Sequence, residues 1–198
     1  KAHKYDSADF KKEFTEKLEL DLNILRDIKK MWANVTTDPK LEQFISELKR
    51  NPVLKKNKVV IFTESKETGD YIYEALQDDF NGKVMFYSSA GGRHSDKNLT
   101  SNHNVARDII TANFDPKYKE KKDDLEILIA TDVLAEGVNL HRSNVLMNYD
   151  LPWNPTRVLQ RAGRVNRLGS KFPKVHIFNF FPTTQSDEHL GLEVNITN

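Results

Sequence analysis

The sequence of 198 residues contains no cysteine, which excludes disulfide bonds and zinc sites built on thiolate ligands. It also lacks any run of about 18 apolar residues, the length that a membrane-spanning helix requires. Its first residues, KAHKYDSADFKKEF, contain no apolar segment of the kind found in a signal peptide. We therefore expect a soluble, cytoplasmic protein that has no membrane partner and holds no metal by itself.

Glycine is scarce, and its positions exclude two kinds of nucleotide-binding loop. The eight glycines are residues 69, 82, 91, 92, 137, 163, 169 and 191. No two of them are five positions apart, so the phosphate loop G-x-x-x-x-G-K-[S/T] is absent from the sequence. No G-x-G-x-x-G follows an apolar run either, which makes a dinucleotide-dependent enzyme the weakest of the functions considered.

Neither sign of charge dominates the chain. Thirty Lys and Arg residues stand against 29 Asp and Glu, a formal net charge of +1, so a surface for nucleic acid would have to be a local patch. The length fits one domain with a hydrophobic core and an appended helical piece. Because the sequence begins with Lys1 rather than Met, we expect it to be a segment of a longer polypeptide.

Five short apolar runs follow residue 57, and they predict buried strands. The runs are KVVIFT (58–63), KVMFYS (83–88), LEILIAT (125–131), NVLMNY (144–149) and KVHIFNFF (174–181). Continuous apolarity is typical of strands buried on both faces, and the long gaps between the runs suit parallel connections. The pattern predicts an α/β fold with a parallel sheet of about five or six strands flanked by helices.

Ligands of such sheets bind beyond the carboxyl ends of the strands, so the segments that follow four of the runs should share one rim. These segments are residues 63–65, 88–93, 131–136 and 150–154. Residues 88–101 and 117–124 are rich in polar and small residues and are expected to be loops.

Helices are expected before and between the strands. A first helix ending near Asn34 is predicted by an apolar stripe at Phe10, Phe14, Leu18, Leu25, Ile28 and Trp32. A second helix restarts after a cap at Thr37 or Asp38, and further helices are expected over 67–79 with Ser65 as cap, over 104–114 and over 155–168. We divide the chain into a helical extension or inter-lobe segment (1–37), the α/β domain (38–183) and a tail (184–198).

The last of these helices, NPTRVLQRAGRVNRLG, carries a concentration of arginine. Asn154 is a suitable N-cap and Gly169 suits the position after the helix. At about 100° per residue, the side chains of Gln160, Arg164 and Arg167 fall within a sector of about 60°, and Arg161 lies about 100° away. Gly163 costs roughly 1 kcal/mol against alanine within a helix, which a close neighbour would explain. The alternatives for this face are a phosphate-binding surface, which the arginine fork favours, and a solvated basic surface.

Two segments resemble a known family. IATDVLAEGVNL (129–140) and NYDLPWNPTRVLQRAGRVNRLGS (148–170) resemble the fifth and sixth motifs of superfamily-two helicases, in the second, C-terminal RecA-like lobe. The run D-x-x-W-N-P (150–155) is most similar to the Swi/Snf-type DNA translocases, although Arg161 and Ser170 stand where that branch usually has Ala and Gln. The resemblance covers residues 38–181 and implies a RecA-like fold.

The resemblance also implies an activity and partners. The chain would be one lobe of an ATP-dependent DNA helicase or translocase, with RNA as the alternative nucleic acid. ATP and Mg²⁺ would be held mainly by an N-terminal RecA-like lobe of the same protein, so this segment alone is expected not to hydrolyse ATP. The competing function is a catalytically silent RecA-like module that binds nucleic acid or protein.

On the catalytic side, the resemblance implies that Arg164 and Arg167 are arginine fingers that reach the γ-phosphate. Such a residue contributes roughly 10³–10⁵ in rate by stabilising charge in the transition state. Gln160 would help to order the phosphate side of the cleft.

On the nucleotide side, Gly137 and Asn139 would approach the ribose, where glycine permits close backbone contact and the asparagine amide both donates and accepts. Asp132 is expected either to brace the cleft by pairing with an arginine or to cap a helix.

For nucleic acid, the candidates are loop hydroxyls, backbone amides and one cation on the same rim. They are Thr63, Ser65, Ser89, Gly91, Arg93 and Thr131. Contacts of this type hold the phosphate backbone without reading the bases. Trp153, between two prolines, is expected to pack within its turn rather than to stack on a base.

Overall fold

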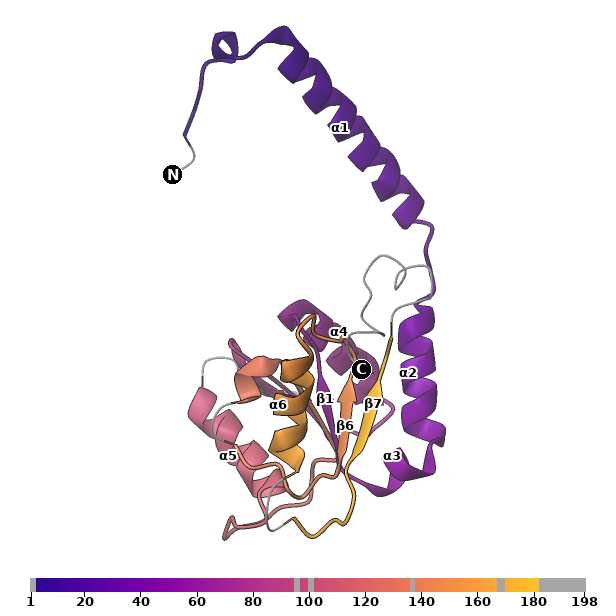
Figure 1. The fold of residues 1–198 in the computed structure, drawn as a ribbon, viewed down its shortest axis with the longest axis vertical. Helices are drawn as coiled ribbons and strands as arrows, with labels where there is room; N and C mark the ends of the chain where they lie inside the picture. The colour runs from indigo at the N-terminus through magenta and orange to yellow at the C-terminus, as the bar shows by residue number, and fades with distance from the viewer. Residues whose placement is uncertain (1–2, 95–96, 100–101, 136–137, 167–169, 182–198) are drawn as a thin grey trace. The chain divides into compact units, whose positions relative to one another are not determined.

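The computed structural model describes residues 3–94, 97–99, 102–135, 138–166 and 170–181 (Figure 1). The chain divides into two compact units, residues 1–43 and residues 44–198. Gly137, Arg167 and the tail 184–198 lie outside the described residues, and their roles and boundaries stay predictions. None of the described helices is long and apolar enough to cross a membrane.

The first unit is helical. A 3₁₀ turn, η1 (Ser7–Asp9), precedes α1 (Lys12–Trp32), and α2 (Pro39–Arg50) begins in the first unit and ends in the second. The predicted end of the first helix near Asn34 is confirmed. Of the two candidate caps of α2, Asp38 accepts a hydrogen bond from the Leu41 amide at 3.0 Å.

The second unit is built on a seven-stranded sheet in the order β4-β3-β2-β5-β1-β6-β7. The strands are β1 (Val59–Phe62), β2 (Val84–Ser88), β3 (Gly91–His94), β4 (Lys97–Leu99), β5 (Ile127–Ala130), β6 (Val145–Asn148) and β7 (His176–Asn179). The five predicted strands are β1, β2, β5, β6 and β7, and their pairings with one another are parallel. The predicted α/β fold is confirmed.

The expectation of a loop over residues 88–101 is wrong, because β3 and β4 lie within it and extend the sheet beyond β2 in antiparallel pairings. The glycines that make this segment resemble a loop, Gly91 and Gly92, have structural roles in the hairpin. Gly91 has a φ of 107°, in the left-handed region that favours glycine. A Cβ on Gly92 would lie 2.7 Å from the Cβ of Ala106, so glycine lets α5 (His103–Phe114) approach β3.

Helices cover both faces of the sheet. Alternate strand residues such as Val60 and Leu128 form one core layer with Ile110 of α5 and Val165 of α6 (Pro155–Val165), and Figure 1 shows α6 in front of the strands. The other face is covered by α4 (Lys66–Gln77), whose Gly69 lies against Phe86. Two short elements complete the unit: α3 (Pro52–Lys56) and the 3₁₀ turn η2 (Asp132–Ala135).

The helix starts follow the predicted capping residues. The Ser65 hydroxyl accepts from the Thr68 amide at 3.0 Å, and the Asn154 side chain accepts from the Thr156 amide at 2.9 Å. The predicted extent of α6 to residue 168 is wrong, because Asn166 leaves the helix with φ −103° and ψ 100°. Asparagine has low helix propensity, which disfavours helix at position 166. Val165, the last helical residue, is buried, so the apolar face of α6 is already packed on the sheet without a further turn.

Candidate functional site

The carboxyl ends of the parallel strands form the rim that the sequence predicts. Because β2, β5, β1 and β6 are neighbours in that order, Ser88, Thr131, Thr63 and Asp150 follow one another along one edge of the sheet. The helix α6 begins just after this edge. Thus α6 can reach residues that lie far apart in the sequence.

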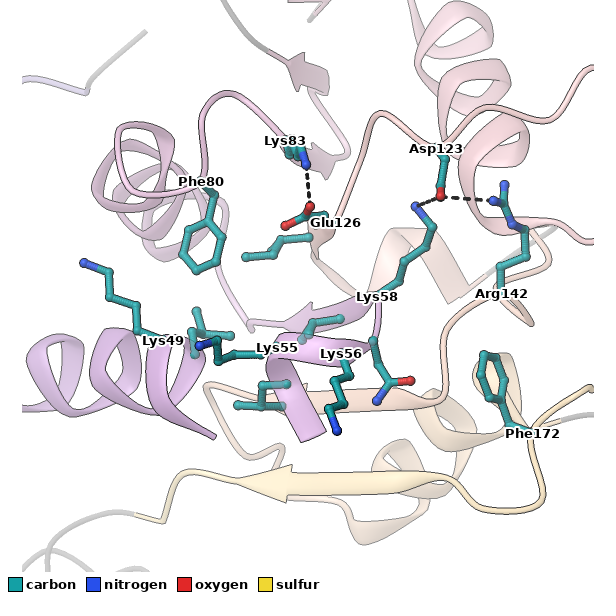
Figure 2. Close-up of a pocket in the computed structure, with 15 residues that line it drawn as sticks. Lys49, Lys55, Lys56, Lys58, Phe80, Lys83, Asp123, Glu126, Arg142 and Phe172 are labelled. Carbon is teal, nitrogen blue, oxygen red and sulfur yellow. Dashed lines mark hydrogen bonds and ion pairs between the residues drawn. The ribbon is translucent and has the colours of Figure 1, made fainter. Parts of the chain in front are cut away.

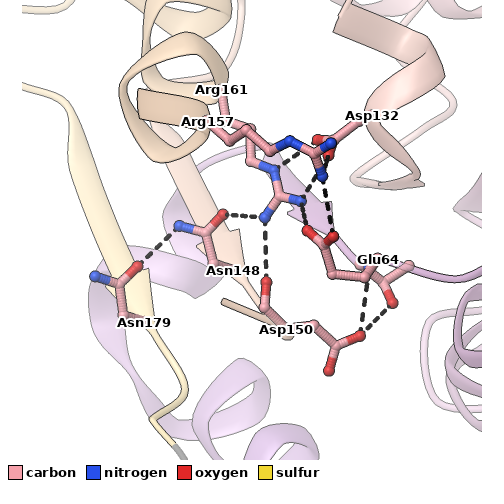
Figure 3. A network of polar contacts seen from close by, with 8 residues as sticks. Glu64, Asp132, Asn148, Asp150, Arg157, Arg161 and Asn179 are labelled. Atoms are coloured by element: carbon pink, nitrogen blue, oxygen red, sulfur yellow. Dashed lines mark hydrogen bonds and ion pairs between the residues drawn. The ribbon is translucent and has the colours of Figure 1, made fainter. Parts of the chain in front are cut away.

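Arg161 is enclosed by oxygen atoms at this rim (Figure 3). Its Nε donates to Oδ1 of Asp132 at 2.7 Å, and its Nη2 donates to Oδ2 of the same carboxylate at 3.1 Å. Its Nη1 donates to Oδ1 of Asn148 at 3.0 Å and to the carbonyl of Asp150 at 3.1 Å, and Nη2 also bonds Glu64. The side chain is only 1% exposed, and all five of its N–H donors are used.

A second arginine balances the two carboxylates. Nη1 of Arg157 lies 3.2 Å from Oε2 of Glu64 and 3.5 Å from Oδ2 of Asp132. The two arginines and two acids therefore neutralise one another, which offsets the desolvation of the buried Arg161 guanidinium. Asp132 pairs with both arginines, and its role in bracing the cleft stays a prediction.

The same contacts join four strand ends. Glu64 follows β1, Asp132 follows β5 and Asn148 ends β6, while Nδ2 of Asn148 donates to Oδ1 of Asn179, the last residue of β7, at 2.8 Å. We call Glu64, Asp132, Asn148, Asp150, Arg157, Arg161 and Asn179 the rim network. It fixes the position of α6 on the sheet edge, because a guanidinium with all its donors used has one acceptable placement.

Arg164 and Gln160 differ from Arg161 in having no such contacts. Neither side chain forms a hydrogen bond or ion pair with any described residue, and they are one helical turn apart on α6. The structure thus brings two of the three predicted catalytic side chains to one face. Arg167 lies outside the described residues, so its place on this face stays a prediction.

The explanation offered for Gly163 is wrong within the part of the chain that the structure describes. A Cβ built at this position meets no atom within 4 Å. Gly163 is exposed between the buried Arg161 and the half-buried Arg164. The described residues therefore leave the surface around it unobstructed.

The predicted nucleotide-side residues Asp132 and Asn139 have different surroundings. Asp132 is occupied by the two arginines, whereas Asn139, after η2, is half-buried and makes no hydrogen bond with the described residues. Among those residues, no group of three His, Cys, Asp or Glu is placed to hold a metal ion.

The predicted nucleic-acid residues also fall into two groups. The hydroxyl of Thr63 is buried and donates to Oδ2 of Asp150 at 2.6 Å, and Ser65 caps α4, so both side chains have structural contacts. Ser89 is exposed at the rim beside Gly91. Thr131 is buried, and its Oγ1 has no hydrogen-bond partner among the described residues.

Arg93 lies away from the rim, so the expectation that all of residues 88–93 share it is wrong. Strand β3 runs back along β2, which places Arg93 opposite Phe86. Its Nη1 lies 2.6 Å from Asp70 and 3.4 Å from Glu74, and its guanidinium lies 4.8 Å from the ring centroid of Tyr73. The hydrogen bond that Arg93 donates to the Asp70 carboxylate raises the pKa of Arg93.

Several rim residues were not among the predicted site residues. Glu64, Arg157, Asn148 and Asn179 hold the network, and two of them had a visible signal, because Asn148 and Asn179 are polar residues within apolar strand runs. A buried amide needs a partner, so such positions predict an internal network. The ring of Trp153, expected to pack in its turn, is instead 67% exposed.

Comparison with known proteins identifies the class. Residues 39–169 match the model of the helicase conserved C-terminal domain, so this chain belongs to that family. It is 35% identical over 156 residues to the uncharacterized ATP-dependent helicase YqhH of Bacillus subtilis, across 79% of this chain and 24% of that protein. It is 26% identical to the ATP-dependent RNA helicase DBP2 of Candida glabrata, across 87% of this chain and 27% of that protein.

Solved structures agree on the fold. The C-terminal part of the Fun30 ATPase domain superposes with a TM-score of 0.56 at 21% identity, over 89% of this chain and 53% of that chain. The S. cerevisiae Dbp5 structure with RNA and ADP BeF3 superposes with a TM-score of 0.54 at 21% identity, over 79% and 36%. The predicted RecA-like C-terminal lobe of a superfamily-two helicase is confirmed. The chain spans about a quarter of the length of the curated relatives described above.

Proposed function

We propose that this chain is the C-terminal lobe of an ATP-dependent DNA helicase or translocase, and that Arg164 is its arginine finger. The observation that carries the proposal is the contrast on α6. Arg161 uses every donor inside the chain, while Arg164, three residues later, forms no ion pair or hydrogen bond with any described residue. A cation left available on a rigid helix is suited to a phosphate group supplied from outside the chain.

The donors near α6 fit a phosphate ligand. Gln160 is exposed and Arg164 is half-buried without a partner among the described residues, and the open surface at Gly163 allows close approach between them. ATP with Mg²⁺ supplies the hydrolysable phosphoanhydride, and we assign most of its contacts to an N-terminal RecA-like lobe, because the sequence has no phosphate loop. The role of this chain is to place a positive charge at the γ-phosphate and to fix it through the rim network. We assign Arg167 to the same role, and Gly137, Asn139 and Asp132 to the ribose side.

The nucleic-acid contacts are proposed for the remaining rim. Ser89, Gly91 and Thr131 offer a hydroxyl, a backbone amide and a buried hydroxyl at the ends of β2 and β5, with Thr63 and Ser65 beside them. Such groups bind phosphate oxygens without sequence preference. DNA is proposed because D-x-x-W-N-P resembles the Swi/Snf-type translocases, and relatives named as RNA helicases make RNA the alternative.

The test uses the longer polypeptide that contains this segment together with its N-terminal lobe. Arg164→Ala should lower nucleic-acid-stimulated ATP hydrolysis by roughly 10³-fold or more while ATP binding is retained. Arg26→Ala, on α1, removes an exposed arginine outside the lobe and is the matched control. Unchanged turnover in Arg164→Ala would refute the finger and favour a silent binding module. Comparing DNA and RNA as stimulators distinguishes the two nucleic acids.

A further inference from the structure

A basic surface lies at the opposite edge of the sheet from the rim. Two hollows adjoin there, one of about 600 Å³ and one of about 220 Å³, and they share Lys58, Arg142 and Phe172. Figure 2 shows the larger of the two. Their cations are Lys49, Lys55, Lys56, Lys58, Lys83, Lys121, Lys171 and Arg142, against only two carboxylates, Asp123 and Glu126. Lys49 is also paired, with Asp79 at 2.6 Å, so these eight cations and three acids leave a local excess of five positive charges in a chain of net charge +1.

The fold explains this concentration. Lys58, Lys83 and Glu126 each precede the first residue of a parallel strand, namely β1, β2 and β5. Parallel strands begin at one edge, so residues that precede them gather there. Each of these strands is four or five residues long, which separates this edge from the rim by about 13–17 Å. We call the two hollows together the amino-edge groove.

The cations of the groove divide into fixed and available groups. Lys58 and Arg142 converge on Asp123, at 2.7 and 3.1 Å, and the hydrogen bond from Lys58 lowers the pKa of that carboxyl. Lys83 pairs with Glu126 at 2.6 Å, a hydrogen bond that raises the lysine pKa. Lys49 pairs with Asp79 at 2.6 Å, so Lys49, Lys58, Lys83 and Arg142 are the fixed cations, and their pairs use both carboxylates that line the groove.

The available cations are lysines that are exposed and form no ion pair with any residue the structure describes. They are Lys55, Lys56, Lys121 and Lys171. They come from three separate segments, α3, the 117–124 loop and the segment before β7, and so they are spread along the groove rather than focused on one point. A spread array matches a ligand that carries one negative charge per repeating unit.

Aromatic rings lie among these cations. Phe172 lines both hollows and Phe80 lines the larger, and both are half-buried. Figure 2 shows them on opposite sides of the larger hollow, with Lys55 and Lys56 between them in that view. Backbone-tracking cations combined with aromatic faces for unstacked bases are the general features of single-strand binding surfaces.

We propose that the amino-edge groove is a second nucleic-acid site, which binds the phosphates and bases of a single strand. The proposal rests on the proposed nucleic-acid binding of this chain and adds a contact surface at the edge away from α6. A single nucleotide would fill one hollow and leave the lysines of the other without a ligand, whereas a strand engages both.

The experiment measures binding of a fluorescein-labelled single-stranded 20-mer to the 198-residue chain by anisotropy over a range of salt concentrations. Lys121→Glu with Lys171→Glu should weaken binding and reduce the slope of log affinity against log salt by roughly 0.7 for each lysine. Lys17→Glu with Lys29→Glu, exposed on α1, changes the net charge equally and is the matched control. The double variant Lys121→Arg with Lys171→Arg keeps both positive charges and should therefore bind with the affinity and the salt slope of the unaltered chain.

A separate variant tests the stacking contribution. Phe172→Leu should lower affinity for the single strand by roughly fivefold or more, with little effect on a duplex of the same length. Equal losses in the groove and control variants, no measurable binding by the unaltered chain, or equal displacement of the strand by polyglutamate would overturn the proposal. In the longer polypeptide, groove variants should keep their ATP turnover at saturating nucleic acid. The groove proposal is therefore tested by strand binding and the Arg164 proposal by ATP hydrolysis, so that one can fail without the other.

Discussion

Arg161 and Arg164 lie three residues apart on α6, and the chain uses all five donors of the first and none of the second within its described part. The rim network therefore holds α6, the helix that also carries Arg164. By locking Arg161 to Glu64 and Asp132, it fixes the helix that presents Arg164. In the arginine-finger role proposed for Arg164, charge preorganised in this way would stabilise the transition state without reorganisation at the moment of reaction.

Arg161→Met should lower the free energy of unfolding by about 3–5 kcal/mol, because Asp132 and Glu64 would lose the buried partner that they share. Arg161→Lys should also destabilise, since an ammonium cannot reproduce the bidentate contact with Asp132. Urea denaturation measures both. Arg164→Met, on the same helix, is the control and should stay within about 0.5 kcal/mol of the unaltered chain. A loss below 1 kcal/mol in Arg161→Met would argue against the network as a structural brace.

Two glycine-to-alanine substitutions should change the free energy of unfolding in opposite directions. Gly163→Ala adds a methyl group in open space and should stabilise the isolated chain by roughly 0.5–1 kcal/mol, because alanine has the better helix propensity. Gly69→Ala should destabilise it by about 1–3 kcal/mol, because the new Cβ would lie 2.3 Å from Cε2 of Phe86. Thermal and urea unfolding of the pair check both signs, and a destabilised Gly163→Ala would show that an internal neighbour does exist.

Asp70→Asn should reduce stability by about 1 kcal/mol at neutral pH. Partial burial of Asp70 favours the neutral acid, but hydrogen bonds from Arg93 and Lys66 outweigh it and lower the pKa below its usual 3.8. A lowered folded-state pKa gives stability that is present above the unfolded value and is lost as the pH falls through the folded value. The difference between Asp70→Asn and the unaltered chain should therefore shrink as the pH falls below 3.8 and through the lower folded-state pKa.

Urea titrations between pH 2 and pH 7 measure this dependence. Glu74→Gln is the control, because its contact with Arg93 is longer, at 3.4 Å, and its side chain is 66% exposed. A difference that stays constant across the range would mean that the ionised Asp70 carboxylate does not stabilise the fold.

Asn113→Ala should cost about 2 kcal/mol, because the buried Oδ1 accepts from the amides of Asp124 and Leu125 at 3.1 and 3.0 Å. The same variant should speed proteolysis within residues 115–124, the segment that leads into β5. Thr111→Ala, which removes an exposed hydroxyl bonded to the Arg107 carbonyl, is the matched control. Equal protease sensitivity in the two variants would contradict the anchoring role.

Most of the fold follows from local signals in the sequence. Continuous apolar runs predict β1, β2, β5, β6 and β7, and the caps at Ser65 and Asn154 predict the starts of α4 and α6. The hairpin of β3 and β4 was missed, because its pairing with β2 supplies hydrogen bonds that no local pattern reveals and its glycines resemble a loop.

For the candidate site, too, the sequence predicts some features and only the tertiary structure reveals the others. Helical periodicity separates Arg161 from Gln160 and Arg164, and the glycine positions exclude a phosphate loop. Periodicity cannot say which arginine has partners, since Glu64, Asp132 and Asn148 reach Arg161 from separate strand ends. Nor can it reveal the amino-edge groove, whose lysines are dispersed through a chain of nearly balanced charge. Burial and long-range contact come from sheet order, which joins residues up to 97 positions apart, as between Glu64 and Arg161.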